Sequence, residues 1–234
     1  MGFRNAACVL ALGAAACSSD PAGPARYSRS GELIALSGGD SGAAGACMNC
    51  HGPRGEGDSN LAPRLAGLDS GYLVRQLTFF AEGLRSHPQM RSIAGRMTSS
   101  QRLAVARHYA AMPVPPLCGT AIGAGRALYQ FGDARRGIPA CAGCHGVRGE
   151  GNPGNPALAG QTASYVLRQF EAWRLGQRRG DPDATMTAIS QRLSPAQASA
   201  LAAHVHRLPG ADDGDRRPRE ACLRAHRGDP RSGA

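Results

Sequence analysis

Apolar side chains recur at helical spacing in several stretches of this 234-residue chain. Within residues 72–84, Leu73, Leu77 and Phe80 fall on one face of a helix. Further helices are predicted at 99–112, 125–131, 165–175 and 194–208. No stretch shows the alternation of apolar and polar residues that is typical of a strand, so the pattern predicts an all-α fold.

The segments between the predicted helices are poor in core-forming residues. Residues 52–64 and 146–157 are rich in glycine, proline and asparagine, and aromatic residues make up only 5% of the chain. Loops of this composition cannot pack as a core without something to wrap around, because they bury too little apolar surface. We therefore expect a bound cofactor with a large apolar face.

The chain contains an internal repeat. The sequence Cys-x-x-Cys-His-Gly begins at Cys47 and again at Cys141, 94 residues later, and a Gly-Glu-Gly triplet follows both copies. Further residues match in the same order at offsets of 93 to 96, which chance does not produce, so the chain is one duplicated domain. The predicted divisions are a signal peptide at 1–16, a flexible segment at 17–30, domains at 31–113 and 125–209, a linker at 114–124 and an Arg-rich tail at 210–234.

Each repeat carries the attachment sequence of a c-type haem. Two thiols three residues apart can bond the two vinyl groups on one porphyrin edge, and the adjacent histidine then lies under the iron. The cysteines are Cys47, Cys50, Cys141 and Cys144, and the proximal ligands are His51 and His145. A bare Cys-x-x-Cys also occurs in redox dithiols and zinc sites, but a zinc site needs four clustered ligands. The sequence predicts two covalently bound haem c groups per chain.

The sixth iron ligands are predicted to be methionines. Met186 is the one methionine after the second motif, and the repeat pairs it with Met90; both fall in stretches that resemble loops before the last helix. Met97 and Met112 pair with leucines and are expected in the core. Ligation by histidine and methionine raises the potential above that of two histidines and saturates the iron, which favours electron transfer over catalysis.

Histidines are the rival ligands. His87 lies three residues before Met90, so two histidines are an alternative ligand set for the first iron. His108 and His204 match in the repeat and are expected at exposed positions of the last helices.

Other residues are candidates for supporting the haems. Pro63 and Pro156 follow the proximal histidines by twelve and eleven residues, and a carbonyl there is suited to accept a hydrogen bond from the second ring nitrogen. The candidates for contact with haem propionates are Tyr72, Gln76, Tyr165, Gln169 and Trp173.

The N-terminus has the features of an export signal. Arg4 precedes a short apolar run over 6–16, which ends in small residues suited to cleavage and is too short to span a bilayer. Cys17 follows directly and is a candidate for lipid attachment; ordinary cleavage is the alternative. We expect a periplasmic protein, either free or tethered to the membrane by an N-terminal lipid.

Two further cysteines, Cys118 and Cys222, each follow the last helix of a repeat. Spare cysteines of an exported protein tend to pair, so a disulfide between these two is a hypothesis.

The formal net charge is +10, and all 27 basic residues are arginines. The use of arginine in place of lysine is typical of a compositional bias in the coding nucleotides. Single arginines are therefore not interpreted as selected contacts. A basic chain can bind nucleic acid, anionic lipid or an acidic protein. No basic stripe interleaved with aromatic residues is present, so nucleic acid is not an expected partner.

The haem motifs with their Gly-Glu-Gly loops, and the matched segments 72–77 and 165–170, resemble class I c-type cytochromes, specifically dihaem proteins of the cytochrome c4 type. The resemblance covers about 31–209 and includes both methionine stretches. It implies two tandem cytochrome c-like domains packed face to face, each wrapped around one haem. It also implies the methionine ligands and periplasmic electron transfer between redox partner proteins, toward a terminal oxidase or another acceptor.

Three functions remain open for such a chain. The first is an electron carrier that shuttles single electrons between a respiratory or dehydrogenase donor and its acceptor. The second is the electron-accepting subunit of a periplasmic dehydrogenase, such as a flavin-dependent enzyme. The third is a dihaem peroxidase, which needs a labile sixth site; the paired methionines argue against it.

Overall fold

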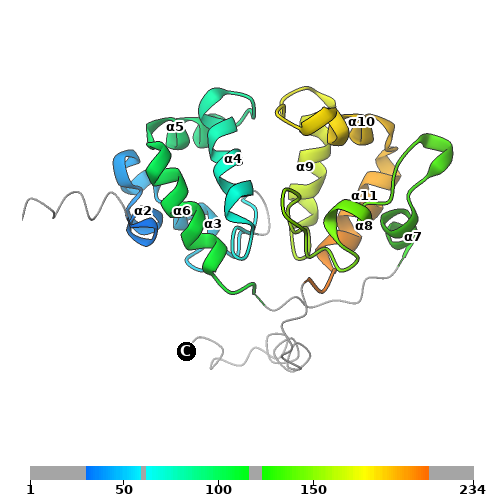
Figure 1. The fold of residues 1–234 in the computed structure, drawn as a ribbon, viewed down its shortest axis with the longest axis horizontal. Helices are drawn as coiled ribbons and strands as arrows, with labels where there is room; N and C mark the ends of the chain where they lie inside the picture. The colour runs from blue at the N-terminus through cyan, green and yellow to red at the C-terminus, as the bar shows by residue number, and fades with distance from the viewer. Residues whose placement is uncertain (1–29, 59–61, 116–122, 211–234) are drawn as a thin grey trace, which may run out of the picture.

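A computed structural model describes residues 30–58, 62–115 and 123–210, which form two helical domains side by side (Figure 1). The predicted signal peptide, Cys17, Cys118, Cys222 and the Arg-rich tail lie outside the described residues, apart from the first residue of the tail. Within the described residues the regular elements are helices, as expected for an all-α fold.

The first domain contains α2 (Gly31–Ser37), η1 (Gly39–Ser41), η2 (Ala43–Gly45), α3 (Met48–His51), α4 (Ser70–Glu82), α5 (Pro88–Arg96) and α6 (Ser99–Ala111). In this domain α6 packs on α2 and α4, and α5 packs on α4.

The second domain contains α7 (Ala124–Phe131), η3 (Ala134–Arg136), α8 (Ala142–His145), α9 (Ala163–Arg174), η4 (Pro182–Ala184), α10 (Thr185–Arg192) and α11 (Pro195–His206). Here α11 packs on α7 and α9, and α10 packs on α9, so the packing of the first domain is reproduced.

The first and last helices of each domain cross with their backbones in close contact. A Cβ atom on Gly31 or Gly125 would collide with the backbone carbonyl of Ala104 or Ala200, respectively. Only glycine permits this approach, which explains why the two glycines match in the repeat. The crossing closes each domain around its Cys-x-x-Cys-His helix.

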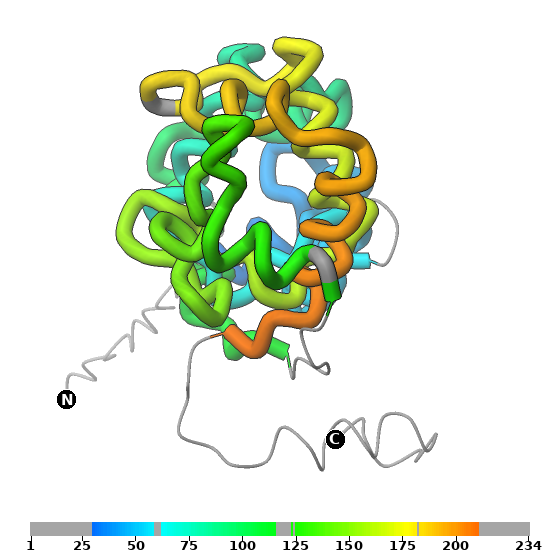
Figure 2. The backbone as a smooth tube through the Cα atoms, turned by 90° about the vertical axis from the view of Figure 1, so that its right-hand side faces the viewer, coloured from blue at the N-terminus to red at the C-terminus, as the bar shows by residue number. Residues whose placement is uncertain are grey.

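Helices α4 and α9 face each other where the two domains meet (Figure 1). Figure 2 looks along the line between the domains, with the second domain in front of the first. The turns after these helices pair across the contact, because Ser86 N donates to Gln177 O at 2.7 Å and Arg179 N donates to Leu84 O at 2.6 Å. The interface therefore has approximate twofold symmetry that follows from the duplication.

Two expectations about local structure are wrong. Met90 and Met186 lie in the first turns of α5 and α10, not in loops. Pro88 and the ring of His87 start α5, since the ring nitrogen Nδ1 accepts a hydrogen bond from Met90 N at 3.3 Å. His204 is buried, at 3% exposure, because α11 presses it against Tyr129 of α7.

Candidate haem-binding sites

The two cysteine motifs form single helical turns of the same geometry. Cys47 and Cys141 directly precede α3 and α8, and none of the four motif cysteines forms a disulfide. Burial raises the pKa of the Cys47 thiol and raises that of Cys141 to about 11, whereas Cys50 and Cys144 are exposed. Each turn thus presents one sheltered and one accessible thiol.

The motif histidines are buried and oriented by backbone carbonyls. His51 Nδ1 lies 2.9 Å from Pro63 O, and His145 Nδ1 lies 2.9 Å from Pro156 O. Burial lowers the pKa of both rings, so they are neutral near pH 7. Because a carbonyl oxygen only accepts, Nδ1 must carry the proton, and the lone pair of Nε2 is available to a metal.

The Gly-Glu-Gly loops hold these prolines in place. Gly57 N donates to His51 O and Gly151 N donates to His145 O, both at 2.8 Å. The backbone then folds back, because Gly55 O accepts hydrogen bonds from the backbone N–H groups of Leu65 and Ala66. The second domain repeats these bonds at Gly149. The motif therefore closes a loop that aims the proline carbonyl at the histidine ring.

The two candidate methionine ligands have different supports. Met90 belongs to a helix with a side-chain N-cap, whereas Met186 follows Asp183 and Ala184, whose φ angles are 52° and 51°. Both methionines are partly buried, and Met186 packs against the core of the second domain. Met97 lies in the first domain's core, as expected.

Three buried arginines at the domain interface fit the anionic groups of haem. Arg64 is 2% exposed, and Arg85 and Arg178 are 7% exposed. Among the described residues, their guanidinium groups bond only carbonyl, amide and phenol oxygens, and Arg64 Nε has no partner. Buried charges require counter-charges, and haem propionates would supply them. The donor set of each domain, with two thiols and a free imidazole Nε2, likewise fits a c-type haem.

The predicted propionate-contacting side chains lie in this same cluster. Tyr72, Gln76, Tyr165 and Gln169 accept hydrogen bonds from Arg85 or Arg178. The sequence reasoning missed the arginines themselves, because the compositional excess of arginine hid them. The signal was present nonetheless: Arg85 and Arg178 match at the same offset of 93 as the tyrosines.

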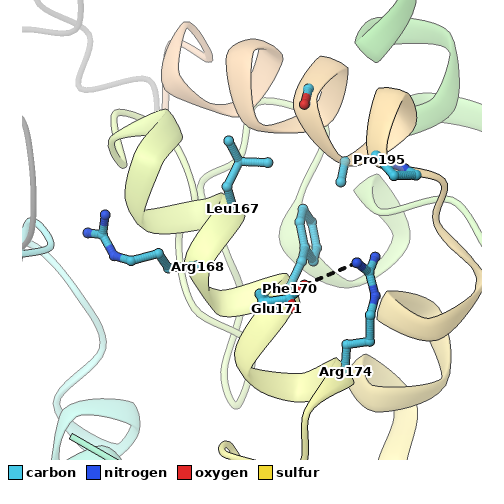
Figure 3. A pocket seen from close by; sticks show the side chains of 8 residues that line it. Leu167, Arg168, Phe170, Glu171, Arg174 and Pro195 are labelled. Carbon is cyan, nitrogen blue, oxygen red and sulfur yellow. Dashed lines mark hydrogen bonds and ion pairs between the residues drawn. The ribbon is translucent and has the colours of Figure 1, made fainter.

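An open groove of about 340 Å³ lies on α9 and α11 (Figure 3). In Figure 3 Arg174 points toward Glu171, and their side chains bond at 3.1 Å. The groove is lined by Leu167, Arg168, Phe170, Glu171, Arg174, Pro195, Ala198 and Ser199. None of them belongs to a Cys-x-x-Cys-His motif.

Two structural searches also bear on the other sequence hypotheses. Within 30–58, 62–115 and 123–210, no group of three or more His, Cys, Asp or Glu side chains is placed to hold a metal ion. Across the same ranges, every helix is too short or too polar to cross a bilayer.

Comparison with protein families gives a match to the Cytochrome c family over residues 123–209. The thiosulfate dehydrogenase electron acceptor of Thiomonas intermedia is 40% identical over 166 residues, which are 68% of this chain and 76% of the relative. Cytochrome c4 of Thiocapsa roseopersicina is 34% identical over 73% of this chain and 91% of the relative.

Solved structures agree with these relatives. Reduced cytochrome c4 of Pseudomonas stutzeri matches with a TM-score of 0.66 and 26% identity, over 74% of this chain and 98% of that one. The thiosulfate dehydrogenase TsdBA of Marichromatium purpuratum matches with a TM-score of 0.67 and 40% identity, over 75% of this chain. This chain spans only 39% of that protein's length.

Proposed function

The chain belongs to the dihaem cytochrome c4 family, and from this premise we propose that it accepts electrons from a thiosulfate-oxidising dehydrogenase. It is an electron-transfer cytochrome with two covalently bound haem c groups. The observation that carries the finer proposal is the 40% identity, over 76% of the relative's length, to a protein named for accepting electrons from thiosulfate dehydrogenase.

Each domain of the chain holds and orients one haem in this proposal. The thiols of Cys47 and Cys50 would hold the first haem, and those of Cys141 and Cys144 would hold the second. Haem c supplies one-electron chemistry at its iron. His51 and His145 provide Nε2 as proximal ligand, while the carbonyls of Pro63 and Pro156 hold each ring in the required tautomer and raise its basicity.

Met90 and Met186 are proposed as the sixth ligands. Their sulfur atoms would close the sixth position of each iron to other ligands, which suits an electron carrier. Met186→Ala should open one iron and lower one potential, leaving the other unchanged in a redox titration with optical detection. The matched control is Met97→Leu, since Met97 is a core residue whose repeat partner is Leu193. Two unaltered low-spin centres in Met186→Ala would refute the assignment.

The proposed donor is tested with purified components. The oxidised protein is mixed with thiosulfate and a purified thiosulfate dehydrogenase, and haem reduction is followed by absorbance. We expect rapid reduction that requires both thiosulfate and the dehydrogenase. Reduction no faster than without the dehydrogenase would contradict the proposal. Co-purification of the two proteins from the native cell would identify a permanent subunit, and separate elution a free carrier.

The site of action is proposed to be the periplasm. The export signal predicted at residues 1–16 and the c-type haem motifs support this location, since both belong to exported cytochromes. Whether Cys17 carries lipid is tested by the mass of the mature protein and by comparing membrane binding of wild type and Cys17→Ser. A soluble wild-type protein without acyl mass would exclude the tether. Mass analysis under non-reducing conditions likewise tests the Cys118–Cys222 disulfide.

A further inference from the structure

The domain interface buries a group of positive charges that no carboxylate of the described residues balances. Arg85 Nη1 donates to Gln76 Oε1 at 2.8 Å, and its Nη2 donates to Tyr165 at 2.8 Å and to Gln169 at 2.6 Å. Arg178 mirrors this arrangement. Its Nη1 donates to Gln169 at 2.9 Å, and its Nη2 donates to Tyr72 at 3.0 Å and Gln76 at 3.1 Å.

Both guanidinium groups are therefore shared between the domains. Each arginine bonds the glutamine of its own domain and also the tyrosine and glutamine of the other. Their backbones meet in an antiparallel bridge, and each guanidinium stacks on an aromatic ring of its own domain, Arg85 on Phe80 at 4.6 Å and Arg178 on Trp173 at 4.1 Å. The side chains are thus fixed in position by both halves of the molecule.

Arg64 adds a third charge between the domains. Its guanidinium donates to Ala66 O of the first domain and to Ala159 O of the second, two residues that match in the repeat. Gln161 of the second domain bonds the backbone of Arg64 from both amide atoms. The repeat partner of Arg64 is Ala157, so the first domain alone supplies an arginine at this position.

The charges of these arginines act on their surroundings. Burial lowers the pKa of Arg178, and the like charge of Arg85 lowers it further. Burial raises the pKa of the Tyr165 phenol, but the charges of Arg85 and Arg178 outweigh that effect and lower it. The charge of Arg85 also contributes to the lowered pKa of the His51 ring, and the charge of Arg178 contributes to that of the His145 ring. The positive charges of the cluster therefore reach the motif histidine of each domain.

We propose that Arg64, Arg85 and Arg178 form one shared counter-charge for the propionate groups of both haems, so that each of Arg85 and Arg178 sets the reduction potential of both centres. The proposal rests on haem attachment at both motifs, as set out under the proposed function. A buried cation near an iron favours the ferrous form, which carries one positive charge less. The arginines act here as positioning and tuning residues.

The test is a spectroelectrochemical titration of the holoprotein that resolves both midpoint potentials. We expect Arg85→Gln and Arg178→Gln each to lower both midpoints. Arg75→Gln is the matched control, because Arg75 also bridges the domains through a hydrogen bond to Gly154 O at 2.7 Å but lies at the exposed surface. It should leave both midpoints unchanged. Arg178→Lys keeps the charge but loses the planar guanidinium group. Its two midpoint potentials should therefore lie closer to those of the wild type than to those of Arg178→Gln.

Several outcomes would overturn the proposal. A shift confined to the mutated domain's own haem would show that the charge is not shared, and unchanged midpoints would show that it does not tune them. An equal shift in Arg75→Gln would mean that the interface acts only structurally. If Arg178→Gln does not fold, Arg178→Lys is measured in its place. Midpoint potentials of Arg178→Lys that are lowered as far as those of Arg85→Gln would refute a charge effect. A protein without covalent haem would instead defeat the proposed function itself.

Discussion

The two domains have the same arrangement of helices, but some side chains with the same role come from different helices in the two domains. In the first domain the buried tyrosine beside the haem motif is Tyr109 of α6, which interacts with the Cys47 thiol. In the second domain it is Tyr129 of α7, whose hydroxyl donates to Gly146 O at 2.7 Å. Where one domain has the tyrosine, the other has Val205 or Ala35. The helix crossing of each domain thus contains one such tyrosine, on the last helix of the first domain and on the first helix of the second.

The arginines that hold the methionine helices show the same exchange. In the first domain Arg102 of α6 donates to Ala94 O near the end of α5, through Nε at 3.2 Å and Nη2 at 3.1 Å. In the second domain the matching carbonyl, Ser190 O, receives Arg174 of α9 instead, at 3.4 and 3.1 Å. The chemical requirement of capping the carbonyl end was kept after duplication, although the residue that meets it was not.

The largest effect is expected from breaking the tyrosine exchange. Tyr129→Ala removes a fully buried ring and should destabilise the second domain by about 3–5 kcal/mol. Adding Val205→Tyr recreates the first domain's arrangement of a small residue opposite a tyrosine, so it should recover part of that loss. Denaturant unfolding with domain-resolved hydrogen exchange measures both. A double variant no more stable than Tyr129→Ala would show that the two positions are not interchangeable.

A smaller effect is expected from the arginine exchange. Arg174→Ala and Arg102→Ala should each cost about 1 kcal/mol, because the bonds they remove are charge-assisted but partly exposed to solvent. The loss should be local: amide exchange should speed up in α10 for Arg174→Ala and in α5 for Arg102→Ala. Exchange that accelerates in the opposite domain, or in neither, would contradict the equivalence of the two clamps.

The smallest effect at neutral pH, and one that grows in acid, is expected at His204. Burial lowers the pKa of His204, with a further contribution from Arg126, and neither ring nitrogen has a hydrogen-bond partner in the described part of the chain. The folded state therefore favours the neutral ring. Below pH 6.5, the ordinary pKa of histidine, the unfolded state binds more protons than the folded state. The stability of the second domain should fall as pH decreases through that value.

The matched variants separate this effect from the titration of other groups. His204→Leu should flatten the acid dependence of the second domain's unfolding, whereas His108→Leu, at the half-buried equivalent position of the first domain, serves as the control. An acid dependence that persists unchanged in His204→Leu would assign it to other side chains.

The sequence was sufficient for the parts of the fold that depend on local pattern. Helical periodicity and the repeat predicted the all-α tandem fold, and the proline spacing led to carbonyls that the structure does place 2.9 Å from both histidines. Met90 and Met186 were expected in stretches that resemble loops, but they lie in the first turns of helices. Proline at the first helical position and a histidine cap instead allow α5 to start there.

The interface was not predictable in the same way. The local sequence does not mark Arg64, Arg85 and Arg178 as buried. Each bonds residues of the other domain, and all three are buried where the two domains meet. His204 was expected to be exposed because histidine is polar, but the close crossing of α7 and α11 encloses it. Contacts between elements distant in sequence decide both cases.

If each Cys-x-x-Cys-His turn bonds one haem, the haem should stay on the chain when the protein is denatured and extracted. The purified protein is denatured and extracted with acidified acetone, and the haem retained per chain is measured from the pyridine haemochrome spectrum. Wild type should retain two equivalents, and replacing either cysteine pair by alanine should leave one. Wild-type protein that retains a single equivalent, or none, would contradict the account.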